Sequence, residues 1–244
     1  MKRTTTAGRG PTRPAARTEE RRRTRPAPLT RRRVLEAAVR LMDREGLEAV
    51  TMRRLGRELG VEAMSLYNHV ESKEDLLAGM LDVVLSEFEL REGEGGDWPE
   101  RVRALARAFR RLLHRHPGLI RLLAEEHEGT GLSPEALRPV EEALATLREA
   151  GLSEEATVHA YRALVGFTLG SVLLELGGFL SDASRQGAAW AESLLRLAPE
   201  RLPTFAAILP HLLRCDPDEE FEFGLDVLLG GLRARLSGST ARRR

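Results

Sequence analysis

Cysteine is almost absent from this chain of 244 residues, and its scarcity limits the chemistry open to the protein. The single cysteine, Cys215, can form neither an internal disulfide nor a metal site that needs several thiolates. The composition therefore favours a protein of a reducing compartment. We expect Cys215 to be a small packed side chain.

Long apolar runs are also missing. The longest candidate, 166–174, is interrupted by Thr168, Gly170 and Ser171, so no run reaches the roughly 18 to 20 apolar residues of a bilayer span. The arginine-rich N-terminus has neither the apolar core nor the cleavage site of a secretory signal. These absences predict a cytoplasmic protein with no membrane partner.

No segment alternates apolar and polar residues as β-strands do. From residue 30 onward, apolar residues recur at helical spacing, with cap residues such as Thr30 and Thr51 before the helices and Gly46 and Gly60 after them. The predicted fold class is therefore all-α. Predicted helices span about 31–45, 52–59, 63–69, 73–88, 98–116, 118–127, 134–150, 154–176 and 204–214, with an uncertain turn or two in 188–197 and a last helix after Asp216.

Basic residues gather at the N-terminus. Residues 1–28 carry a formal charge of +7, while the whole chain carries +1. The same segment mixes Thr, Gly, Pro and Arg without apolar periodicity, so we expect a disordered arm. A basic arm on a mildly acidic body favours a polyanionic partner, nucleic acid first, although a merely solubilising tail would explain the composition equally well.

Residues 51–70 carry the clearest functional pattern. They predict two short helices joined by a three-residue turn that begins at Gly60, which is helix-turn-helix spacing. Gly56 supplies a small residue at the crossing, and Asn68 on the outward side could pair with adenine in a major groove. An ordinary helical hairpin would share this pattern. The residues expected to contact bases or phosphates are Thr51, Arg53, Ala63, Met64, Ser65, Tyr67, Asn68, His69 and Lys73.

Residues 30–90 closely resemble the N-terminal DNA-binding domain of the TetR family of transcriptional regulators. The run TMRRLGRELGVEAMSLYNHVESKEDLLAGM matches the family's second to fourth helices without a gap, and Leu-Gly-Val at 59–61, Leu-Tyr-Asn-His-Val at 66–70 and the following Lys73 are family hallmarks. The resemblance implies a three-helix helix-turn-helix domain followed by a helical domain for ligand binding and dimerisation.

A weaker resemblance to the tetracycline-repressor subgroup continues past residue 97. The segments GFTLGSVLLEL at 166–176 and FEFGLDVLLGGLR at 221–233 look like its two dimerising helices, which implies an Ω-shaped homodimer. The glycines of both segments would allow close approach of helices, either across a dimer or within one monomer. The expected dimer contacts are Phe167, Gly170, Leu174, Phe221, Leu225, Leu228 and Leu232.

The resemblance also implies a small-molecule cavity, mostly apolar with a few polar groups. Its expected lining residues, each of which could also be plain core, are Leu105, Phe109, Leu112, His116, Leu123, His127, Leu144 and Phe167. The magnesium-linked histidine positions of the tetracycline repressor are unmatched, so tetracycline is not the expected inducer. His114 and His116 face away from one another on a helix, and neither a metal nor a cofactor is predicted.

The predicted function is a ligand-responsive transcriptional regulator, more often a repressor in this family, that binds a palindromic operator as a homodimer and is released by a small-molecule inducer. A ligand near the helix that contains Phe109 would shift the helix of residues 73–88 and move the two DNA-binding domains of the dimer apart. The alternatives are a sequence-indifferent architectural DNA binder that uses the basic arm, and a helical enzyme. No paired carboxylates in a recognisable site, glycine-rich phosphate loop or Ser-His-Asp constellation supports the enzyme.

The predicted domains are a disordered basic arm at 1–28, a helix-turn-helix domain at 29–90, a regulatory and dimerisation domain at 97–236, and a disordered tail at 237–244.

Overall fold

The computed structural model describes residues 28–90, 96–125, 132–176, 202–212 and 216–241. Every regular element in these ranges is helical, which confirms the all-α prediction. The elements are α1 (Arg31–Glu45), the 3₁₀ turn η1 (Leu47–Ala49), α2 (Met52–Leu59), α3 (Ala63–Leu66), α4 (Lys73–Ser86), α5 (Trp98–Arg115), α6 (Leu119–Ala124), α7 (Pro134–Glu149), α8 (Glu154–Leu176), α10 (Pro203–Leu212) and α11 (Pro217–Ala241).

Side-chain caps fix where several helices begin. The hydroxyl oxygens of Thr30, Thr51 and Ser72 each accept a hydrogen bond from the backbone N–H three residues later, which satisfies a donor that the helix leaves free. Asp97, the residue before α5, makes no such bond with its side chain. Gly60 ends α2 with φ of +69°, a left-handed conformation that glycine adopts without steric cost.

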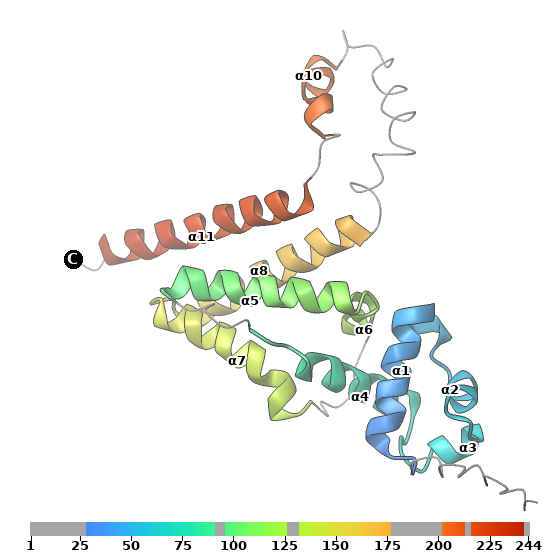
Figure 1. The fold of residues 1–244 in the computed structure, drawn as a ribbon. Helices are drawn as coiled ribbons and strands as arrows, with labels where there is room; N and C mark the ends of the chain where they lie inside the picture. The colour runs from blue at the N-terminus through green and yellow to red at the C-terminus, as the bar shows by residue number, and fades with distance from the viewer. Residues whose placement is uncertain (1–27, 91–95, 126–131, 177–201, 213–215, 242–244) are drawn as a thin grey trace, which may run out of the picture.

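The helices form two groups that share a core. In Figure 1, α1, α2 and α3 lie at one end, and α5, α7, α8 and α11 form the other, with α4 and α6 between them. Leu41 of α1, Leu66 of α3 and Met80 of α4 belong to the same buried cluster as Leu113 of α5 and Leu119 of α6. A second cluster joins α5, α7, α8 and α11. Burial is therefore continuous from the first group to the second.

Several predicted boundaries need correction. Helix α3 ends at Leu66, not residue 69, because the Leu66 carbonyl accepts from both His69 and Val70 and the chain continues as a turn. Helices α4 and α6 end at Ser86 and Ala124 instead of 88 and 127. Helix α11 runs to Ala241, so the disordered tail predicted from residue 237 is wrong for 237–241. The predictions for 1–27, 188–197, His127 and Cys215 fall outside the described residues.

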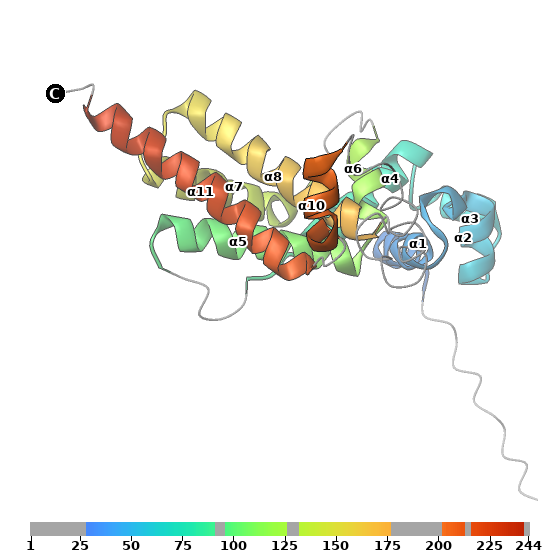
Figure 2. The same cartoon turned by 90° about the horizontal axis from the view of Figure 1, so that it is seen from above.

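Helix α8 is, in the part of the chain that the structure describes, the one helix long and apolar enough to cross a membrane. The sequence prediction required an uninterrupted apolar run. Helix α8 passes the test of length and composition because the small polar residues that interrupt its apolar run carry no charge. Length and composition are weak evidence for a span, since core helices pass the same test. Here α8 packs along α5, α7 and α11 (Figure 2).

Candidate nucleic-acid interface and ligand cavity

Helices α2 and α3 cross at a glycine. A Cβ atom at Gly56 would lie 2.9 Å from the Val61 carbonyl oxygen and 3.2 Å from the Ala63 nitrogen, and these backbone atoms cannot move aside. The Val61 N–H donates to the Gly56 carbonyl at 2.9 Å. Leu55 and Leu66 are fully buried beneath the crossing. Local sequence therefore fixes the angle at which α3 leaves α2.

The outer side of α3 and the turn after it presents a mixed surface. The side chains of Met64 and Tyr67 are 73% and 46% exposed, and Asn68 is exposed too. Ala63, Ser65 and His69, also predicted to contact DNA, are half-buried neighbours on the same short segment. The structure thus brings these six predicted residues together. Thr51 is exposed at the start of α2, but its hydroxyl is engaged by the Arg54 N–H at 3.2 Å.

Cations beside this surface differ in their availability. Arg53 and Lys73 are exposed, and no ion pair to another described residue holds either of them. Arg57, which the sequence analysis did not place in the site, lies one turn after Arg53 and is equally exposed and unpaired within the described ranges. Arg54 is different, because Glu45 and Glu58 hold it at 2.5 and 3.1 Å. Arg53, Arg57 and Lys73 are therefore the cations free to meet phosphates.

Helix α4 connects this surface to the rest of the molecule. At its start, Asp75 forms a two-point ion pair with Arg31 of α1, with N···O distances of 2.5 and 2.7 Å. Arg31 also donates to the His69 carbonyl at 2.9 Å, which ties the end of the α3 turn to the same pair. Further along, a Cβ at Gly79 would clash with the Leu35 side chain of α1. Helices α1 and α4 are thereby packed and paired as one unit.

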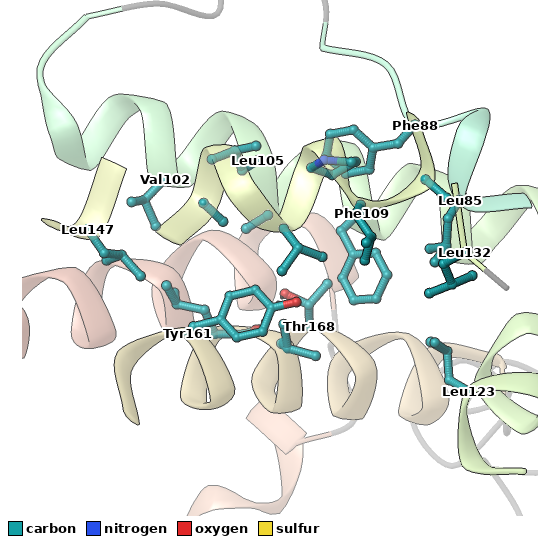
Figure 3. Close-up of a pocket in the computed structure, with 18 of the residues that line it drawn as sticks. Leu85, Phe88, Val102, Leu105, Phe109, Leu123, Leu132, Leu147, Tyr161 and Thr168 are labelled. Atoms are coloured by element: carbon teal, nitrogen blue, oxygen red, sulfur yellow. Dashed lines mark hydrogen bonds between the residues drawn. The ribbon is translucent and has the colours of Figure 1, made fainter. Parts of the chain in front are cut away.

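The other end of α4 borders a cavity of about 290 Å³ in the second helical group (Figure 3). The lining comes from the end of α4, from α5, α6, α7 and α8, and from the segment before α7, and it contains no charged side chain among the described residues. The lining residues are Leu81, Leu85, Phe88, Val102, Leu105, Ala106, Phe109, Leu123, Leu132, Ala136, Leu137, Pro139, Val140, Ala143, Leu147, Tyr161, Leu164, Val165 and Thr168.

Three of the predicted cavity residues, Leu105, Phe109 and Leu123, do line this cavity. Four do not, for identifiable reasons. Leu112 is buried in the core cluster shared by both helical groups, and His116 is held between two carboxylates. Leu144 and Phe167 are each one position from residues that face the cavity, Ala143 and Thr168, and one position rotates a side chain by about 100° around a helix. His127 is outside the described residues.

Two hydroxyl groups supply the polar character of the cavity. Tyr161 and Thr168 both come from α8, and Figure 3 shows the Tyr161 hydroxyl directed toward Thr168. The Thr168 hydroxyl donates to the Leu164 carbonyl at 2.9 Å, as is common for threonine within a helix. Burial raises the pKa of Tyr161, so this phenol stays protonated at neutral pH. Tyr161 is thus the hydrogen-bond donor that the cavity offers.

Comparison with known proteins agrees with this arrangement over most of the chain. Residues 34–80 match the family model for bacterial regulatory proteins of the tetR family, and residues 91–236 match that for the tetracyclin repressor-like C-terminal domain. The chain belongs to the TetR family. This member of the family is therefore a DNA-binding transcriptional regulator.

Individual relatives of this TetR-family chain cover most of its length. The HTH-type transcriptional repressor DrrR1 of Streptomyces coeruleorubidus is 36% identical over 215 residues, which are 84% of this chain and 77% of that protein. A class A tetracycline repressor protein of Escherichia coli is 30% identical over 83% of this chain and 89% of its own. The structure of ActR from Streptomyces coelicolor in complex with actinorhodin has a TM-score of 0.72 and 31% identity, covering 85% of this chain and 97% of that one.

The predicted dimer residues of this TetR-family chain divide into buried and exposed sets. The rings of Phe167 and Phe221 stack with centroids 5.4 Å apart, and Phe221 and Leu225 are fully buried within the chain. Leu228 and Leu232 are partly buried against the same cluster. Gly170 and Leu174 lie on the open side of α8, with nothing within 4 Å of a Cβ at Gly170.

The exposed face of α11 carries different residues. Phe223 is 72% exposed and Val227 is 60% exposed, whereas Phe221 and Leu225, two positions before each of them, point into the core. A Cβ at Gly230 or Gly231 would meet nothing within 4 Å. Both stripes of α11 contain apolar residues at helical spacing, so the sequence pattern does not distinguish the buried stripe from the exposed one. Phe221 and Leu225 pack inside the chain, whereas Phe167 is only half-buried and stacks on Phe221.

Among the described residues, no group of three His, Cys, Asp or Glu side chains is placed to hold a metal ion. The two histidines that end α5 have separate partners instead. His114 Nε2 lies 2.7 Å from the Glu175 carboxylate. His116 is buried and contacts carboxylates of α1 and of the residue that follows α4.

Proposed function

We propose that this regulator is a repressor that binds a palindromic operator as a homodimer and is released when a small molecule fills the cavity between α5, α7 and α8. The observation that carries this proposal is the course of α4. This helix begins at Lys73, next to the α3 surface, and its last turn supplies Leu85 to the cavity wall, as Phe88 does just after the helix ends. A ligand that favours one position of this end changes the position of the DNA-binding helices.

DNA recognition is assigned to the exposed side of α3 and the turn after it. Asn68 and Ser65 have the hydrogen-bonding groups to read base edges, Met64 offers an apolar contact, and Arg53 and Lys73 are free cations for phosphates. The division into a DNA-binding domain at 29–90 and a regulatory domain at 97–236 follows from this assignment. A transcriptional regulator of this type acts in the cytoplasm, where the bacterial chromosome lies.

Dimerisation is assigned to the open faces of α8 and α11. Large exposed apolar side chains, Leu173 and Phe223 among them, lie on the same helices as glycines that have no side-chain neighbours. Such a surface is unfavourable in water and suits close packing of helices from a second copy. Two copies would present two helix-turn-helix domains to the two halves of a palindrome.

The ligand class follows from the cavity lining. A charged group would lose its hydration there without gaining a partner, so we propose a neutral, largely apolar molecule with an oxygen that accepts a hydrogen bond from Tyr161. ActR, a structural relative, has been solved in complex with actinorhodin. Actinorhodin serves as a first probe because this relative binds it.

The function is tested by selecting bound fragments from a random DNA pool with the full-length protein. We expect an enriched palindrome, with half-sites about one helical turn or a multiple of it apart. Enrichment without any common sequence would favour the architectural DNA binder, and the absence of bound DNA would overturn the proposal.

Release is then tested on the selected operator with actinorhodin as the probe. We expect it to lower operator affinity for the wild type, and Tyr161→Phe to need more probe because one hydrogen bond of about 1 kcal/mol is lost. Affinity for the probe is also measured without DNA. Tyr161→Phe should weaken it, whereas Met64→Ala, which lies on α3 away from the cavity, should leave it unchanged.

A further inference from the structure

His116 lies at the corner between α5 and α6, where the regulatory helices meet α1. It is the C-cap residue of α5, its N–H donates to the Leu112 carbonyl at 2.9 Å, and its own carbonyl accepts from the Leu119 N–H at 2.9 Å. Two residues later, a Cβ at Gly118 would overlap the Met42 side chain of α1. The corner is therefore held rigidly against α1, and the side chain of His116, only 7% exposed, has a fixed position.

Each ring nitrogen of His116 faces a carboxylate from a different element. Nδ1 lies 2.9 Å from Oδ2 of Asp43 on α1, and Nε2 lies 3.1 Å from Oε2 of Glu87, the C-cap residue of α4. A neutral imidazole has one N–H only, so both contacts are donated hydrogen bonds when the ring is protonated. Arg115 of α5 also lies 3.5 Å from the same Glu87 oxygen.

Glu87 is bonded directly to a residue of the cavity wall. Phe88 lines the cavity and is buried, while the carboxylate of Glu87 reaches the His116 ring. A displacement of the Phe88 backbone by a bound molecule must therefore move Glu87 as well. The opposite carboxylate, Asp43, belongs to α1, which the Arg31–Asp75 pair ties to the start of α4.

We propose that His116 couples the cavity to the DNA-binding helices, because an occupant that displaces the end of α4 separates Glu87 from His116 and loosens the hold of this corner on α1. This inference rests on the proposed function of the cavity. His116 is a positioning residue, since it touches neither the cavity nor the DNA-binding surface. The triad of Asp43, His116 and Glu87 favours the DNA-binding arrangement, and occupation of the cavity works against it.

The test uses a substitution that fills the cavity in place of an unidentified ligand. Ala143→Phe adds a ring to the cavity wall on α7, and its effect on operator affinity is measured in the wild type and in His116→Gln. We expect Ala143→Phe to weaken operator binding by roughly fivefold or more in the wild type, the size of ordinary allosteric coupling. In His116→Gln, which already binds more weakly, the added loss should be much smaller.

Arg121→Gln is the matched control. Arg121 of α6 pairs with Glu48 of η1 and so also joins a regulatory helix to the DNA-binding group. Both side chains are largely exposed, and exposed pairs contribute little to stability. Ala143→Phe should keep its full effect in Arg121→Gln. An equal loss from Ala143→Phe with and without His116, or no loss in the wild type, would overturn the proposal. Should His116→Gln fail to fold, Asp43→Asn breaks the same triad with a smaller change.

A measurement without DNA separates this inference from the proposed function. The imidazole resonances of His116 report its protonation by NMR, and Ala143→Phe should move its pKa back toward the ordinary histidine value as Glu87 withdraws. An unchanged titration in Ala143→Phe would overturn the coupling even if operator binding is confirmed. Failure to select any operator, with the expected shift in titration present, would instead count against the proposed function alone.

Discussion

Surroundings give identical side chains different roles in this protein. Arg53 and Arg54 are adjacent on α2, yet Arg54 is held by Glu45 and Glu58 while Arg53 stays free for a phosphate. His114 and His116 differ in the same way, since His114 is partly exposed beside one carboxylate and His116 is buried between two. Availability to a ligand is thus decided by the partners that the fold brings to each residue.

His116 should make stability depend on pH. The hydrogen bond that the protonated ring donates to Asp43, and then the one that it donates to Glu87, raise the pKa of His116 despite its burial. A raised folded-state pKa gives stability that is fully present below the ordinary histidine value of about 6.5 and is lost as pH rises through the folded value. The difference in unfolding free energy between wild type and His116→Gln, measured by urea denaturation, should therefore shrink as pH increases above about 6.5.

The Arg121→Gln variant serves as the comparison for this pH series. Arginine does not titrate in this range, so its difference from the wild type should be nearly constant. A wild-type advantage over His116→Gln that grows with pH would show that His116 is neutral in the folded protein.

Structural features whose cause is local could be predicted from the sequence. The caps at Thr30 and Thr51 and the end of α2 at Gly60 are decided by residues within one helical turn, and the structure has them as predicted. The partners of His116 could not be predicted in this way. Asp43 is 73 positions away and Glu87 is 29 positions away, so no spacing rule connects them.

At the scale of elements, the existence of helices was predictable and their rotation was not. Every predicted helix within the described residues is present, but α7, α8 and α11 each have two stripes that contain apolar residues. On α7 and α8 the cavity side is one position from the predicted Leu144 and Phe167. On α11, Phe221 packs on Phe167 and leaves Phe223 in solvent. Which stripe is buried depends on neighbouring helices that local patterns do not specify.

The rotation of α11 leads to a prediction on assembly. Phe223→Glu places a charge on the exposed face proposed for dimerisation, where it would lose hydration on contact with a second copy. We expect monomers of unchanged helical content, measured by sedimentation and circular dichroism, and much weaker operator binding. Met64→Glu, an equally exposed apolar position on α3, should weaken operator binding but leave the dimer intact. Dimers of Phe223→Glu as stable as the wild type would remove this face from the interface.

At the scale of the whole molecule, positive charge is concentrated toward the N-terminal end of the chain. The α2–α3 surface lies at one end of the molecule and the C-terminal end of α11 at the other (Figure 1). The basic segment 1–27 is joined to α1, so the excess positive charge of the sequence directly precedes the DNA-binding helices in the chain. Composition alone did not distinguish a DNA-binding arm from a solubilising tail, because both require only charge. Because the segment is joined to the helix-turn-helix domain, a DNA-binding arm is favoured over a solubilising tail.

Removal of residues 1–27 should weaken operator binding and reduce its dependence on salt. Each phosphate neutralised by a basic residue contributes about −0.9 to the slope of log affinity against log salt concentration, and this segment holds Lys2 and eight arginines. We expect a shallower slope in fluorescence-anisotropy titrations and an unchanged preferred sequence. Replacing Arg242, Arg243 and Arg244 by serine also lowers the net charge, but these residues follow α11 and should leave the slope unaltered. An unchanged slope after removal of 1–27 would make the segment a solubilising tail, and a changed sequence preference would place its side chains in a groove of the DNA.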